Sequence, residues 1–167
     1  GRHVQVAVSA RDDPNGPYSA FAPIEIAGYD LQAGSNIYFA AVKPNPIDER
    51  TLLGLFPAAL HEDGYLGMVG LSISCDGVYW APLVEIVQSL VIANRTTHHP
   101  VDGFALRNGV VFAYVHAHVP GIRHQYGWRP RSAKPSVVPF ALNRTLLQRM
   151  TRAAFYHLPG CARVGSR

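Results

Sequence analysis

The sequence predicts an all-β protein built from antiparallel β-propeller-type blades, about two to three of them, with one C-terminal α-helix. Three observations predict this fold. Short apolar runs are separated by turns, and the 167-residue chain holds 15 Gly and 13 Pro. A segment near the N-terminus recurs about 60 residues later. One stretch of helical spacing follows the last strand-like runs.

Period-2 alternation of apolar residues predicts the first strand. Val4, Val6 and Val8 alternate with smaller or more polar residues, and a turn follows at 11–16. Asn108-Gly109 is a dipeptide that favours a two-residue hairpin loop between two later strands. The further strand-like runs are 18–26, 37–42, 52–60, 65–74, 79–87, 101–107 and 110–119.

The helix is expected near the C-terminal end. Asn143 is a suitable N-cap, and Pro159-Gly160 is a suitable stop. We expect residues 1–142 to form the blades, as a fragment of a larger domain, and residues 143–158 to form a helix packed on the same domain. Because Val4 already has the pattern of a strand interior, further blades and any targeting signal are expected upstream. The apolar residues at helical spacing are Leu147, Met150, Ala154 and Leu158.

An internal repeat organises the strands. Residues 4–9 align with residues 69–74, and each copy is followed by a turn containing Asp and Gly, an aromatic residue and another apolar strand. Glu25 and Glu85 then fall at matching ends of the two copies. We therefore predict that residues 4–26 and 67–86 are equivalent halves of successive four-stranded blades.

Composition and charge exclude several classes of protein. Apolar residues make up 48% of the chain and charged residues 16%, which is atypical of a disordered tail or a coiled coil. The net charge of +4 comes mostly from arginines that are scattered rather than clustered, so nucleic acid is not an expected partner. The sequence has no apolar stretch of about 18 residues, and no membrane span is expected.

The segment Ser74-Cys-Asp-Gly-Val-Tyr-Trp-Ala-Pro82 resembles the motif S-x-D-G-x-x-W-S-x-P of the five-bladed β-propeller glycosidase-like families, which include relatives of β-fructosidases and arabinanases. A weaker copy lies at 9–19. In this motif Asp and Gly close a hairpin and the aromatic residue packs between sheets, so Asp76 and Trp80 are predicted to be structural. The resemblance implies that the chain binds carbohydrate or hydrolyses glycosidic bonds.

The acidic residues depart from the pattern of those families. Glycoside hydrolysis uses two carboxyl groups about 5 to 9.5 Å apart. The sequence has no Arg-Asp-Pro motif inside a predicted strand, because its Arg11-Asp12-Asp13-Pro14 lies in a turn. It also has no Glu-Cys general-acid motif. Asp102, at the start of an inner-type strand, is the candidate catalytic acid. Its alternative role is to cap the turn after Pro100.

Four histidines are candidate substrate-binding residues. His116 and His118 share one face of a predicted strand, and His98 and His99 lie at the start of the preceding strand. Imidazoles bind sugar hydroxyls or metals, so a metal-dependent enzyme is an alternative. The glutamate that follows His-x-His in cupin metal sites is absent here, and surface or hydrogen-bonded histidines are the blander interpretation. We expect no bound metal and no cofactor.

Two more polar residues are candidate substrate-binding residues. Asn45 follows an inner-type strand and is placed to reach the mouth of a central channel, although turn formation around two prolines explains it equally well. Arg95 lies in a polar loop. The expected partners are carbohydrate and either a partner chain or missing upstream blades. An alternative function is a non-catalytic module whose loops bind another protein.

Two cysteines and two sequons leave the compartment open. Cys75 and Cys161 allow one disulfide bridge and lack the spacing of zinc ligands. The sequons Asn94-Arg-Thr96 and Asn143-Arg-Thr145 matter only in a secreted protein, and chance occurrence is the favoured interpretation of both.

Overall fold

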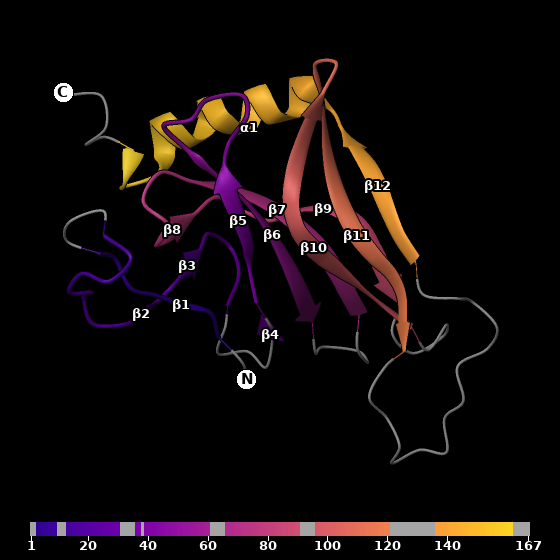
Figure 1. Cartoon of the computed structure of the whole chain (residues 1–167), viewed down its shortest axis with the longest axis horizontal. Coiled ribbons are helices and arrows are strands. Elements are labelled where there is room, and N and C mark those ends of the chain that lie inside the picture. The colour runs from indigo at the N-terminus through magenta and orange to yellow at the C-terminus, as the bar shows by residue number, and fades with distance from the viewer. Residues whose placement is uncertain are drawn as a thin grey trace, which may run out of the picture.

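The computed structural model confirms an all-β chain with one C-terminal helix (Figure 1). It describes residues 3–9, 13–30, 36–37, 39–60, 66–90, 96–120 and 136–161. Within them it describes every side chain except those of 59–60, 66–67, 88–90, 96–97, 102 and 118–120.

The main sheet is an antiparallel meander whose two central strands are β6 (Leu52–Leu60) and β7 (Leu66–Ser74). The outer edge of β6 pairs with β4 (Asn36–Ile37) and then with β5 (Ala41–Pro44). The outer edge of β7 pairs with β8 (Tyr79–Trp80) and then with β9 (Val84–Leu90). Each outer strand of the meander is thus interrupted once.

Alternation along β6 explains why this sheet is buried on both faces. Leu53 and Leu55 belong to one buried apolar cluster, whereas Phe56 and Ala58 belong to a second cluster. Successive side chains of a strand point to opposite faces, so the continuous apolar run of β6 supplies both clusters. The main sheet is therefore the central layer of the molecule.

A second sheet covers one face of the main sheet. Its three antiparallel strands follow chain order: β10 (Thr96–Arg107), β11 (Val110–Pro120) and β12 (Ser136–Leu142). Asn108 and Gly109 both have positive φ, at 48° and 76°, which confirms the two-residue hairpin loop expected between β10 and β11. Side chains from alternate positions of β11 enter the apolar cluster shared with β6 and β7, and these are Val111, Ala113 and Val115.

The helix α1 (Arg144–His157) lies across one end of the two sheets (Figure 1). Asn143 caps it, as predicted, because its side-chain oxygen accepts a hydrogen bond from the backbone N–H of Leu146. Leu147 and Ala154 are buried in the same cluster as β6, β7 and β11. The apolar stripe of α1 therefore closes the end of the core between the sheets.

An N-terminal hairpin packs against the other face of the main sheet. It contains β1 (Gln5–Val6) and β2 (Ala22–Pro23), and an isolated bridge between Ser9 and Tyr18 extends their pairing. Ile24 and Ile26 are buried with residues of β4, β6 and β8, and the part-buried Val4 and Val6 pack on the same cluster.

The prediction that segments 4–26 and 67–86 form equivalent halves of successive blades is wrong. The strand β3 (Glu25–Ile26) pairs in parallel with β8 of the main sheet, where the Glu25 N–H donates to the Val78 carbonyl oxygen. The end of segment 4–26 is thus hydrogen-bonded to segment 67–86 within the main sheet, whereas β1 and β2 form a separate two-stranded sheet. The outer edge of β8 offers backbone groups that need partners, and β3 supplies them.

Glu25 and Glu85 are consequently not equivalent positions. Glu25 pairs with Tyr79 in a parallel bridge, whereas Glu85 pairs with Gly70 in an antiparallel ladder. The similarity of the two Glu-Ile dipeptides reflects only their place at the end of an apolar run. Strand pairing depends on which sheet edge lies nearby, and the sequence pattern does not encode it.

Candidate functional site

The structure brings two of the four predicted histidines into one cross-strand pair. His99 on β10 lies directly opposite His116 on β11, next to the buried pair Pro100 and Val115. Directly opposed residues of an antiparallel pair lie on the same face, so the two imidazoles are neighbours. Register shifts occur in β10 on both sides of the pair, before His99 and after Pro100. Such irregularities re-aim side chains and often accompany functional sites.

An aromatic ring from the main sheet completes this group. Phe39, just before β5, stacks on His99 with ring centroids 6.2 Å apart and planes 21° from parallel. The Phe39 side chain is 39% exposed, and His98, His99 and His116 are half-buried. We call Phe39, His98, His99 and His116 the histidine cluster. It lies where β10 meets the segment leading into β5, so both sheets contribute to it.

The electrostatics of the histidine cluster keep one imidazole neutral. Burial lowers the pKa of His99, and positive charge on His116 and His98 lowers this pKa further. His99 is therefore uncharged at neutral pH. A neutral imidazole has one donor nitrogen and one acceptor nitrogen, and in His99 the Nδ1 atom is buried away from solvent.

The described residues lack a metal site. Among them, no three His, Cys, Asp or Glu side chains converge in a way that could hold a metal ion. The metal-dependent alternative therefore gains no support from the histidine cluster. The one helix in the same residues is not long and apolar enough to cross a bilayer.

Three predicted site residues lie partly or wholly outside the described residues. Asp102 is on β10 and His118 is on β11, but neither side chain is among those that the structure describes. Arg95 lies entirely outside it. Their roles stay predictions.

Asn45 is a structural residue, and its predicted contact with sugar is wrong. The side chain is fully buried. Its Nδ2 atom donates to the hydroxyl oxygens of Thr51 and Thr151, at 2.9 Å each, and its Oδ1 atom accepts from the Ile47 N–H. Asn45 thus ties the β5–β6 turn to α1, and the turn interpretation is confirmed. Thr151 was not recognisable as its partner because 106 residues separate them in the chain.

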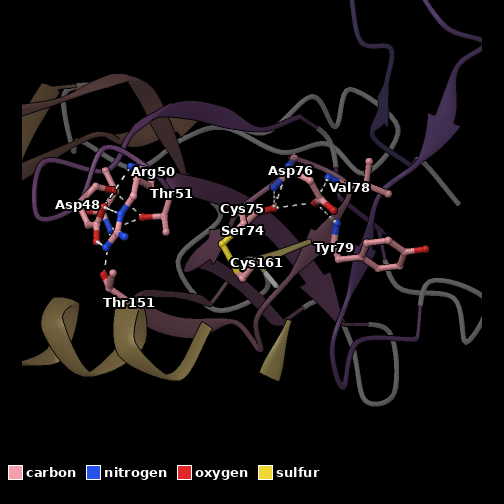
Figure 2. The surroundings of a disulfide bond; sticks show 12 residues. Asp48, Arg50, Thr51, Ser74, Cys75, Asp76, Val78, Tyr79, Thr151 and Cys161 are labelled. Atoms are coloured by element: carbon pink, nitrogen blue, oxygen red, sulfur yellow. Dashed lines mark hydrogen bonds and ion pairs between the residues drawn. A yellow bond between two sulfur atoms is a disulfide. The ribbon is translucent and has the colours of Figure 1, made fainter. Parts of the chain in front are cut away.

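The Ser74-to-Pro82 motif also has a structural role, as predicted. Figure 2 shows the turn after β7, where the Asp76 carboxylate accepts hydrogen bonds from the backbone N–H groups of Val78 and Tyr79, at 2.9 Å each. Trp80 is 2% exposed, and its Nε1–H donates to the Gly77 carbonyl oxygen. Its ring meets Phe56 edge-on at 4.8 Å. The motif therefore closes a hairpin and fills the core.

A disulfide joins this turn to the end of the helix. Cys75 and Cys161 form the one bridge that the sequence allows, and Figure 2 places it between the Asp76 turn and the residues after α1. Asp48 and Arg50 form an ion pair at 2.6 Å in the β5–β6 turn, and the guanidinium lies 4.8 Å from the ring centre of Phe155 on α1. The helix is thus held at two separate points.

Phe39 is the residue of the histidine cluster that sequence reasoning missed. It lies in the strand-like run 37–42, whose residues are apolar at every position, so each of them looked like a core residue. Exposure of a large aromatic ring is visible only in the structure.

A scan against models of protein families and searches of curated proteins and solved structures find no match to this chain.

Proposed function

We propose that this protein binds carbohydrate non-covalently at the histidine cluster. The observation that carries the proposal is the partly exposed Phe39 ring, which stacks on His99. His116 lies directly opposite His99 on the neighbouring strand. A sugar ring has an apolar C–H face and polar hydroxyl edges. An aromatic face flanked by imidazoles complements both, because the ring packs on the C–H face and the nitrogens hydrogen-bond the hydroxyls.

The chemistry of the cluster favours binding over hydrolysis. Its members supply an apolar ring and imidazoles, whereas glycoside hydrolysis uses two facing carboxyl groups. Hydrolysis would require Asp102, three residues after His99 in the chain, together with a second acid. The Ser74-to-Pro82 motif has a structural role in this chain and adds no catalytic group, so the carbohydrate class of ligand depends on the chemistry of the histidine cluster.

Titration calorimetry with fructan and arabinan oligosaccharides, after a glycan array, tests the proposal. Phe39→Ala and His116→Ala are expected to weaken binding about tenfold or more, because each removes a central contact worth about 1.4 kcal/mol. Phe21→Ala and His157→Ala are matched controls, since both side chains are exposed and lie outside the cluster. The controls should leave the affinity within about twofold of the wild type.

Two results would contradict carbohydrate binding at this place. One is the absence of any glycan that binds the wild-type chain at millimolar concentration. The other is a glycan whose affinity falls equally in Phe39→Ala and in Phe21→Ala. Circular dichroism of each variant distinguishes loss of a contact from loss of the fold.

Protein binding is a second candidate function, favoured by exposed apolar side chains on the second sheet. Val137 on β12 is 56% exposed and lies opposite His116, and Val110 at the start of β11 is 38% exposed. Concentration-dependent association in analytical ultracentrifugation that Val137→Asp abolishes would support this alternative. A chain that stays monomeric and binds glycans would exclude self-association through this face and leave the carbohydrate proposal in place.

A further inference from the structure

The disulfide indicates the kind of compartment in which this fold matures. It joins positions 86 residues apart, and the Cys161 side chain is 2% exposed within the main apolar cluster. Cys75 packs partly buried against the same cluster. Structural disulfides of this kind persist in oxidising compartments such as the secretory pathway and are rare where thiols are kept reduced. The disulfide therefore favours a secreted protein, which is the case in which a sequon can be glycosylated.

One sequon lies in a geometry suited to modification. Asn143, Arg144 and Thr145 are all exposed, at the junction of β12 and α1. Asn143 has extended backbone angles, with φ −66° and ψ 115°, and it precedes the first helical residue. Its side-chain Oδ1 accepts from the Leu146 N–H at 3.1 Å. The cap uses the amide oxygen, whereas a glycan attaches to the amide nitrogen.

We propose that Asn143 is an N-glycosylation site. The donor is an oligosaccharide linked to a lipid through pyrophosphate. A bond forms between Nδ2 of Asn143 and the anomeric carbon of the first sugar, the bond from that carbon to the pyrophosphate oxygen breaks, and the lipid pyrophosphate leaves. One Nδ2 proton passes to a base of the transferring enzyme, and nothing is oxidised or reduced. The product is still an amide whose oxygen can cap α1.

The glycan would lie away from the histidine cluster. On β12, Val137 is opposite His116, and Asn143 follows six residues further along an extended segment. At about 3.3 Å per residue this separates the glycan from the cluster by roughly 20 Å. The inference is therefore independent of the proposed carbohydrate binding, and modification at Asn143 should leave ligand affinity unchanged.

The test uses the full chain behind a cleavable secretion signal, translated in the presence of endoplasmic-reticulum microsomes. All forms carry Asn94→Gln, which removes the second sequon. The expected result is a protease-protected product whose lowered gel mobility is reversed by peptide N-glycosidase, with Asn143 converted to Asp in the released peptide. Mass spectrometry of that peptide identifies the site.

Three variants separate the sequon from the helix cap. Asn143→Gln removes both the acceptor nitrogen and the native cap, whereas Thr145→Ala removes only the sequon hydroxyl and keeps Asn143. Both should abolish the mobility shift. Thr145→Ser keeps a hydroxyl and should retain the shift. A translocated, protease-protected chain in which Asn143 is unmodified would overturn the proposal, as would a shift that persists in Thr145→Ala.

Discussion

Removal of the Cys75–Cys161 bridge should strongly lower the free energy of unfolding. The bridge closes a loop across 86 residues of sequence separation. In the chain-entropy model, a cross-link over a loop of that length stabilises the fold by about 4.6 kcal/mol at 25 °C, with measured losses of about 2–5 kcal/mol for native bridges. For a chain of this size the loss corresponds to a fall in Tm of about 10–15 °C.

The assay is urea-induced unfolding followed by circular dichroism, with three samples. They are the oxidised wild type, the wild type kept reduced, and the double variant Cys75→Ala with Cys161→Ala. The reduced wild type keeps both side chains, so its difference from the oxidised form measures loop closure alone. The double variant loses packing as well and should be at least as unstable. A loss of less than about 1 kcal/mol on reduction would refute the argument, since it would mean that the bridge constrains the unfolded chain far less than its loop length predicts.

Two further predictions concern single residues of the fold. The pKa of His99 is lowered in the folded state, so the unfolded chain binds more protons than the folded chain as the pH falls through the unfolded-state pKa of about 6.5. The free energy of unfolding should therefore fall between pH 7 and pH 5. His99→Gln should flatten that part of the profile. An unchanged slope in His99→Gln would show that other groups cause the dependence. Asn45→Ala should cost about 1–3 kcal/mol in urea denaturation, because it leaves the buried Thr51 and Thr151 hydroxyls without their shared donor. Lys43→Ala, on the exposed end of β5, is its control, and equal stability of the two variants would contradict the structural role of Asn45.

The strands and the helix were largely predictable because their signals are local. The apolar run at 52–60 predicted a strand, and β6 confirms it. Asn108-Gly109 predicted a hairpin, and both residues have positive φ. Asn143 predicted the start of α1. Each of these signals depends on neighbouring residues in the chain, and local preferences of this kind survive into the folded state.

The candidate site was predictable only in part. The histidines were identified because their residue type and spacing are visible in the sequence, and two of them pair across β10 and β11. Phe39 escaped notice because an apolar run does not show which ring will be left exposed. Asn45 was predicted to reach the mouth of a channel, although it is buried. The prediction failed because its partner Thr151 lies on a helix that is distant in the sequence.

By itself, the sequence determined the all-β class, the positions of most strands other than β12, the closing turn at Asp76 and the capped helix. Only the tertiary structure decided that β3 joins β8, that Phe39 meets His99, and that Cys75 reaches Cys161. The physical reason is the range of the interactions. Turn chemistry, capping and side-chain alternation act over a few residues, whereas edge pairing and side-chain clusters depend on which distant segments are brought together when the apolar faces are buried.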